Sequence, residues 1–463
     1  MQAPSLSRSS HLPRGSRLRL ALLAVLCAAL VAGASWIVRS NGPMSPATSP
    51  VSARGGDAGA PSIDVGTTDG LLPPDQRVAF WERRVAAGGT YLDLIHLADA
   101  YVDRTRASGD TADLQRAEVA LEEALETAPN RALVRVREAQ VAFSLHDFER
   151  ALAIGGEVLE TAPDDLAALS VTGDSLLELG QVEAAAERYK RLGALSPSPA
   201  SWSRLGRLAF LNADVDAALA LVTRAADEAD AGFPDEIAFY NVQLGDLDRA
   251  LGRLSDAEAA YGAALGAMPG HPAASVGLAH VREAQGRRSE AIGLLEEAVE
   301  RLPQPEWVAT LGDLYALDGQ TERAADEYAL VEAIAGLDGG ASVYDRVYIG
   351  FLADHGRGVD EAVRRARAAL ETRKDVHGYD ALAWALYAAG DLDAAAGAAS
   401  KAMALGTPDA RILYHAGLIA QARDDEPAAR DLLAQAREGV AILPPLQVPR
   451  LDKAIAELGE RQP

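Results

Sequence analysis

Nine times in this chain a Gly or Ala is followed, twelve residues later, by an Ala. The first members of these pairs are Ala139, Gly173, Gly206, Gly245, Ala279, Gly312, Gly350, Ala383 and Gly417, and most successive pairs are about 34 residues apart. Two helices cross closely only where their side chains are small, so each pair describes one helical hairpin. Recurrence of the pair predicts a solenoid of stacked hairpins.

The composition and the positions of proline and glycine agree with this architecture. Apolar residues make up 49% of the chain but aromatics only 5%. The apolar residues are mostly Ala and Leu, which favour helices over strands. Prolines end the second helix of a hairpin at Pro129, Pro163, Pro197, Pro269 and Pro303. Glycines are expected in the turn inside a hairpin at Gly180, Gly286 and Gly390.

The spacing of larger residues resembles the tetratricopeptide repeat. One stretch matches at Leu244, Gly245, Ala257, Tyr261, Ala264 and Pro269, another at Leu311, Gly312, Tyr315, Ala324 and Tyr328, and Trp202, Leu205 and Gly206 match the first half. The resemblance covers about residues 90 to 437. It implies an all-α fold, a right-handed superhelical solenoid of about ten hairpins over residues 74–442. Residues 443–463 are expected to form a C-terminal capping helix.

The N-terminus predicts export. A basic segment, residues 1–19, precedes an apolar run over residues 20–38 that is long enough to span a bilayer. Its positive flank is expected to stay in the cytoplasm, which leaves the solenoid outside. Uncleaved, this run is a membrane anchor; alternatively, cleavage near Ala34 releases the protein. Residues 39–73 are rich in Pro, Ser and Gly and predict a disordered linker.

Nothing in the sequence indicates catalysis. The net charge of −23 disfavours nucleic acid and anionic lipid as partners. Cys27 is the only cysteine, and the eight histidines have no compact metal-binding spacing. Asp354 with His355, and His377 with Asp380, come nearest to an acid–base cluster. We therefore predict that the protein is not an enzyme and has no cofactor and no metal.

The resemblance implies that first helices line a concave face. The amino-terminal half offers Ser170, Asp174, Ser203, Arg207, Asp246 and Arg249 there, whereas the carboxy-terminal half offers Tyr344, Phe351, His377, Trp384, Tyr387 and Tyr414. Aromatic residues are enriched at binding hot spots, so the second set is a candidate partner-binding groove. The alternative is that these rings pack against neighbouring first helices. Tyr189, Tyr261 and Tyr328 occupy the packing position of second helices and are expected in the core.

The expected function is a protein–protein interaction scaffold or adaptor outside the cytoplasm of a bacterial envelope. The abundance of Ala and Gly, with only four Lys against forty Arg, indicates a GC-rich bacterial genome. The scaffold would bind a partner protein or peptide in the concave groove. The alternative function is an accessory subunit of an envelope enzyme or export complex.

Overall fold

The computed structural model describes residues 72–129, 131–337 and 345–460, and this part of the chain forms 22 α-helices and no strand. The predicted basic segment, the apolar run and nearly all of the linker lie outside the described residues. Among the helices that are described, none combines the length and the apolar character needed to cross a membrane.

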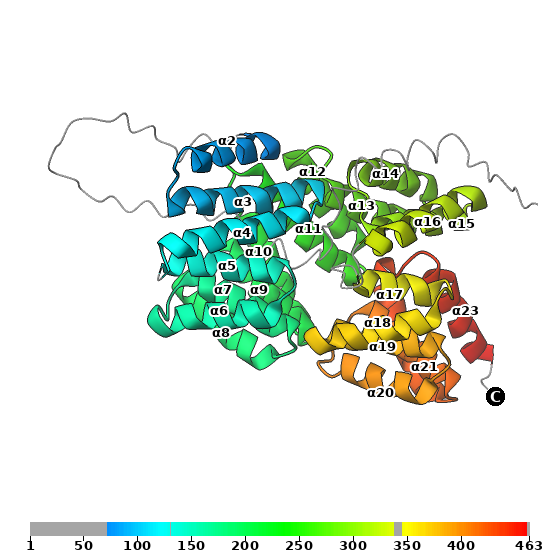
Figure 1. The fold of residues 1–463 in the computed structure, drawn as a ribbon. Coiled ribbons are helices and arrows are strands. Elements are labelled where there is room, and N and C mark those ends of the chain that lie inside the picture. The colour runs from blue at the N-terminus through cyan, green and yellow to red at the C-terminus, as the bar shows by residue number, and fades with distance from the viewer. Residues whose placement is uncertain (1–71, 130, 338–344, 461–463) are drawn as a thin grey trace, which may run out of the picture.

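Ten helical hairpins follow a single helix, α2 (Pro74–Ala86), as Figure 1 shows. The hairpins are α3/α4 (Tyr91–Ser108, Ala112–Thr127), α5/α6 (Ala132–Ser144, Phe148–Thr161), α7/α8 (Leu166–Glu178, Val182–Leu195), α9/α10 (Pro199–Leu211, Val215–Asp227), α11/α12 (Pro234–Ala250, Leu254–Ala267), α13/α14 (Pro272–Ala284, Arg288–Arg301), α15/α16 (Pro305–Leu317, Thr321–Leu337), α17/α18 (Asp345–Asp354, Val359–Thr372), α19/α20 (Val376–Ala388, Leu392–Ala402) and α21/α22 (Ala410–Ala422, Glu426–Glu438). The predicted solenoid of about ten hairpins is confirmed.

The small-residue pairs lie at the crossings of the hairpins. The Ala that closes each pair is buried in all nine hairpins, with at most 3% of its surface exposed. A Cβ placed on Gly173 would lie 2.6 Å from the ring of Tyr189, and Gly245 and Gly312 stand in the same relation to Tyr261 and Tyr328. These three tyrosines are buried in the core, as predicted. The ring therefore packs where the first helix has no side chain.

Proline and glycine end the helices where the sequence predicts. Second helices end at Thr127, Thr161, Leu195, Ala267 and Arg301, each two residues before the corresponding proline. Gly180, Gly286 and Gly390 have φ angles of 75°, 76° and 78° in the hairpin turns. At the equivalent places His146, Ala213 and Asp424 also have positive φ, a conformation that costs less for Gly than for these residues.

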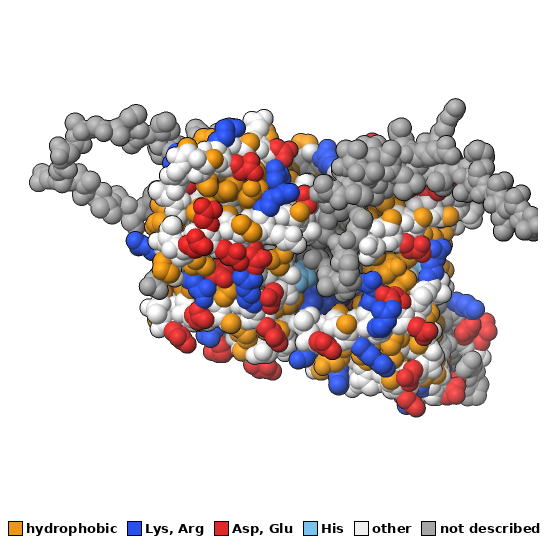
Figure 2. Space-filling view, in the orientation of Figure 1, with side chains coloured by type: hydrophobic (Ala, Val, Ile, Leu, Met, Phe, Trp, Pro, Cys, Tyr) orange, Lys and Arg blue, Asp and Glu red, His pale blue; other side chains and the backbone are white. Residues whose placement is uncertain are grey.

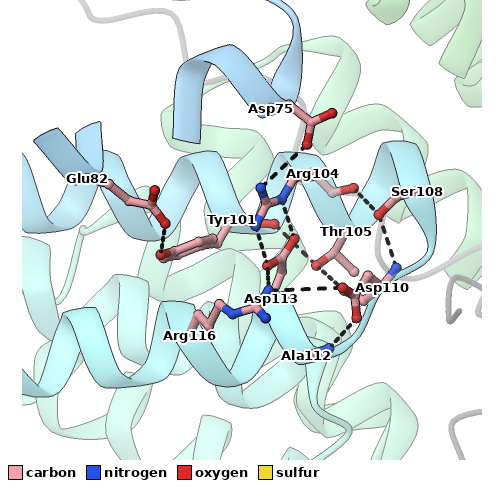
Figure 3. A network of polar contacts seen from close by, with 10 residues as sticks. All are labelled: Asp75, Glu82, Tyr101, Arg104, Thr105, Ser108, Asp110, Ala112, Asp113 and Arg116. Carbon is pink, nitrogen blue, oxygen red and sulfur yellow. Dashed lines mark hydrogen bonds and ion pairs between the residues drawn. The ribbon is translucent and has the colours of Figure 1, made fainter. Parts of the chain in front are cut away.

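In the first hairpin the first helix, α3, has 18 residues, whereas most other first helices have 13. Arg104 in the added length donates two hydrogen bonds to the buried carboxylate of Asp113, at 2.6 and 2.7 Å (Figure 3). The Thr105 hydroxyl donates to the carbonyl of Asp110 at 2.9 Å. Tyr101 donates to Glu82 at 2.8 Å and so ties α2 to α3. The network adds polar contacts to a turn that, like those of other hairpins, has a glycine with positive φ, Gly109 at 79°.

The last helix, α23 (Gln447–Glu460), packs against the tenth hairpin after a short 3₁₀ turn, η3 (Val440–Ile442). Leu451, Ala454 and Leu458 are buried against it, in one cluster with Leu433. Asp452 and Lys453 on the opposite face are exposed. This helix covers the apolar end of the array, the role predicted for residues 443–463.

The array coils until its later hairpins meet its earlier ones. The turns after α7, α9 and α11 lie against the segments that follow α18, α20 and α22, and we call this contact the seam. In Figure 1 the seam runs where α8 to α10 approach α18 to α20. The solenoid is thus closed between its two halves.

Candidate functional site

The seam has a constant register along the chain. Arg373 binds Glu178 across 195 residues, Thr407 binds the carbonyl of Leu211 across 196, and Arg249 binds the carbonyl of Ala441 across 192. Because most hairpins take about 34 residues, this separation equals between five and six hairpins. The superhelix therefore returns to itself once in that length, and the turns after α7, α9 and α11 meet the chain one superhelical turn later.

A buried carboxylate anchors the first contact of the seam. Glu178 at the end of α7 is fully buried and accepts hydrogen bonds from Arg373 at 2.6 Å and from Arg207 at 3.0 Å. Burial alone would raise the pKa of Glu178, but the two guanidinium groups outweigh it and hold that pKa well below its usual range. Glu178 is therefore ionised and binds both halves of the array.

Backbone contacts make the rest of the seam. The Thr407 hydroxyl donates to the carbonyl of Leu211 at 2.6 Å, where α9 ends and its last carbonyls have no helical partner. A Cβ on Gly180 would collide with the carbonyl oxygen of Lys374, and one on Gly252 would collide with that of Glu438. Both glycines also have positive φ. Close approach of two backbones across the seam thus requires glycine at these two turns.

A cavity of about 260 Å³ lies in the seam, and we call it the seam cavity. Its apolar lining comes from both halves of the array and includes Leu177, Val182, Leu211, Val376 and Leu405. Four basic or titratable cationic side chains also line it: Arg207, Lys374, His377 and Lys401. Figure 2 shows Lys or Arg and His side chains in the hollow between the α5–α10 and α17–α20 groups.

Five of the six side chains predicted to form a binding groove are described, and they differ in their exposure to solvent. Phe351, Trp384 and Tyr414 are buried, with 3%, 3% and 0% of their surface exposed, so they offer no side chain to a partner. His377 and Tyr387 are partly exposed, and His377 lines the seam cavity. Tyr344 lies outside the described residues. The three buried rings thus pack inside the array, which was the alternative to a binding groove. For Tyr344, His377 and Tyr387, a role in partner binding stays a prediction.

Two of the buried rings, Trp384 and Tyr414, belong to a core shared by the last first helices and α23, whereas Phe351 packs with Tyr328 in the core of the preceding hairpins. Trp384 stacks on His415 with ring centroids 4.1 Å apart, and its indole nitrogen donates to Asp354 at 3.0 Å. Gln447 of α23 also donates to Asp354, at 2.8 Å. Burial raises the pKa of Asp354 against these hydrogen bonds. Trp384 and Tyr414 therefore lie in the core that the capping helix covers.

The predicted acid–base residues do not converge. Asp380 is paired with His415 at 2.9 Å, and His355 is paired with Asp313 at 3.0 Å. Burial lowers the pKa of His355, but its hydrogen bond to Asp313 outweighs this and the net pKa is raised. His377 lies apart from these pairs, at the seam. In the described ranges no group of three or more His, Cys, Asp or Glu side chains could hold a metal ion.

Polar first-helix residues of the amino-terminal half are engaged inside the array. Asp174 accepts from Arg204 at 2.9 Å and from Tyr189 at 2.8 Å. Ser203 donates to Gln243, and Asp246 accepts from Tyr261 at 2.7 Å. Arg207 and Arg249 are in the seam. These residues therefore make contacts within a hairpin, between neighbouring hairpins or across the seam, and these contacts were not predicted.

A different surface of the amino-terminal half carries exposed apolar side chains. Seam contacts use its hairpin turns, so its opposite edge, where one hairpin connects to the next, is left free. Large apolar side chains stand at this edge with 37% to 44% of their surface exposed: Leu92, Leu133, Leu166, Leu195 and Phe233. We call this set the loop edge. The predicted concave positions do not include it, and its sequence signal is weak: Leu133 and Leu166 are 33 residues apart, one less than the 34 that separate their hairpins.

Two segments of the chain match family models of the tetratricopeptide repeat, residues 171–233 and residues 248–314. These stretches therefore carry tetratricopeptide repeats. Together with the ten stacked hairpins, they define the class of protein as a tetratricopeptide-like helical solenoid. No curated protein matches the chain.

Solved structures with a similar fold include a tetratricopeptide repeat protein from Parabacteroides merdae, with 18% identity over 53% of this chain and 93% of that chain and a TM-score of 0.39. PilW, a type IV pilus biogenesis factor, has 20% identity over 46% and 95%, with a TM-score of 0.38. The human IFIT1 dimer has 14% identity over 79% and 90%, with a TM-score of 0.45.

Proposed function

We propose that this protein is an interaction scaffold of a bacterial envelope, tethered outside the cytoplasm through residues 20–38, whose protein partner docks on the loop edge. Its tetratricopeptide repeats support a role in protein–protein interaction. The apolar run and its basic flank support the location. The proposal includes no catalytic step.

The observation that carries the docking surface is a pair of leucines at nearly equivalent positions of two successive hairpins, 33 residues apart where the hairpins themselves are 34 residues apart. Leu133 and Leu166 stand in the first turns of α5 and α7, which contact each other, with 44% and 38% of their surface exposed. Both side chains leave apolar surface open to solvent on a strongly charged protein, and we infer that a partner covers this surface. The net charge of −23 favours a partner segment with apolar anchors and flanking Arg or Lys.

The test uses the full chain in crosslinked membranes, with a Leu133→Glu/Leu166→Glu variant. Val119→Glu is the matched control, because Val119 lies on α4 away from the edge and is 62% exposed. We expect wild type and control to recover the same partner in constant amount, and the double variant to lose it while keeping its circular dichroism. Equal recovery by all three proteins would exclude docking on this edge.

Two further readouts separate the alternatives. A partner that purifies in fixed ratio indicates an accessory subunit, whereas partners that exchange indicate a scaffold. N-terminal sequencing and fractionation test the tether. A soluble protein beginning at Ser35 would refute an uncleaved anchor.

A further inference from the structure

The seam cavity concentrates positive charge in an acidic protein. The whole chain has only four lysines, and two of them, Lys374 and Lys401, line this one cavity together with Arg207. Lys374 follows α18, and Lys401 is in the last turn of α20. The ammonium of Lys401 lies 5.1 Å from the ring centroid of Tyr379, which also lines the cavity.

The acidic groups around the cavity are already engaged by arginines or backbone. Asp375 accepts from Arg346 at 2.5 Å and from the backbone nitrogen of Gly378 at 2.8 Å. Glu178 binds Arg207 and Arg373. Within the described residues, neither the side chain of Lys374 nor that of His377 has a hydrogen bond or an ion pair. The charge of Lys374 therefore has no counter-ion among the described residues, and the cavity attracts anions.

Part of the lining is apolar and buried. Leu177, Leu211 and Val376 each have less than a tenth of their surface exposed. A volume of about 260 Å³ is just below the range of roughly 300–1,000 Å³ that is usual for ligand pockets, so only a small ligand fits. Cations beside an apolar floor match a molecule with an anionic head and a short hydrocarbon stem.

We propose that the seam cavity binds a small amphiphilic oxyanion, an alkyl carboxylate or alkyl phosphate. The oxyanion is held by Lys374 and Lys401, and the stem packs on Leu177, Leu211 and Val376. Because Leu177 and Val376 belong to opposite halves of the array, bound ligand contacts both sides of the seam. A ligand that binds only the closed array stabilises it by mass action. This inference does not depend on the partner docking proposed above.

The experiment titrates the full chain in detergent with hexanoate and with hexyl phosphate by calorimetry. Hexanol and hexylammonium test the need for negative charge, and inorganic phosphate tests the need for the stem. The variant is Lys374→Gln/Lys401→Gln. Lys190→Gln is the matched control, because Lys190 lies on α8 outside the cavity with 66% of its side chain exposed.

We expect wild type and the control to bind at least one of the two amphiphilic anions, and the double variant to bind it about tenfold more weakly or worse. The tighter of the two anions identifies the head group. The proposal is overturned if neither anion binds, if the double variant binds as well as wild type, or if hexanol binds equally. Inorganic phosphate binding as tightly as hexyl phosphate would also overturn it, because the apolar floor would then have no part in recognition.

Discussion

The hairpin crossings and the seam are built in opposite ways. At a crossing, Gly173 and Tyr189 belong to the two helices of one hairpin, and the same arrangement recurs at Gly245 and Gly312. In the seam, Glu178 meets Arg373 across 195 residues, and the other seam contacts described above are of different kinds. Crossings are thus local and periodic, whereas the seam is long-range and made of individual contacts.

Because of this difference, the stability of a single hairpin and the closure of the superhelix depend on different contacts. In an array whose units contact only their neighbours, stability is a sum of local hairpin and interface contributions. The seam adds contacts between hairpins that are not neighbours. Loss of a seam contact should therefore open the superhelix while the hairpins stay folded, whereas a change at a crossing should unfold a hairpin.

The largest effect is expected from Glu178→Gln. Removing the carboxylate leaves the Arg207 and Arg373 guanidinium groups without their counter-charge, at a cost of about 3 kcal/mol to closure. The radius of gyration by small-angle scattering should increase while helix content by circular dichroism stays constant. Glu187→Gln is the control, because Glu187 is 74% exposed and its surface pair with Lys190 contributes little. An unchanged radius would show that this ion pair does not hold the seam closed.

A crossing is tested by Gly173→Ala. The added Cβ would lie 2.6 Å from the Tyr189 ring, so the ring must shift, which we expect to destabilise the hairpin by about 2 kcal/mol. Gly293→Ala is the control: a Cβ there has no neighbour within 4 Å, and Ala in a helix should stabilise by about 0.5–1 kcal/mol. Thermal melts should move in opposite directions. Equal shifts would mean that the crossing has room for a methyl group.

A smaller effect is expected from Thr407→Val, which removes one hydrogen bond from the seam at nearly constant volume. The carbonyl of Leu211 would lose the hydroxyl at 2.6 Å, at a cost of about 1 kcal/mol. The control is Thr310→Val, where the hydroxyl bonds to the carbonyl of Glu306 within its own helix. Thr407→Val should increase the radius of gyration slightly. If Thr310→Val did the same, the contact across the seam would have no special role.

The repeat frame could be predicted from the sequence because each of its contacts recurs. Gly and Tyr at a crossing appear at fixed spacing, and proline marks where second helices end, so hairpin number and boundaries follow. The seam has no such pattern: Arg373 and Thr407 lie in connecting segments that the repeat does not constrain. The only signal was local, because Thr407 stands where the repeat usually has proline.

The candidate site was predictable only in part, for the same reason. The excess of aromatic residues at carboxy-terminal first helices is real, but their surroundings include α23, whose Gln447 reaches Asp354 across 93 residues. The sequence does not reveal that contact, and the positions of Trp384 and Tyr414 in it are equally consistent with a groove and with a core. His377 lines the seam cavity because the superhelix brings Arg207 and Leu211 to the same cavity. The periodicity of the sequence does not predict which hairpins meet after one superhelical turn.

A pH dependence is expected from His146, in the turn after α5. Burial and the nearby Arg373 charge lower the pKa of His146 to about 3; Glu178 opposes the shift, and Arg346 adds to it. The unfolded chain binds this proton near pH 6.5 and the folded chain does not, so stability present above about pH 6.5 is lost as pH falls towards 3. His146→Asn removes the titrating group, and Asn tolerates the φ of 64°. Unfolding free energies at about pH 7 and pH 5 should differ less in the variant than in wild type; an identical difference would show that His146 does not link protonation to folding.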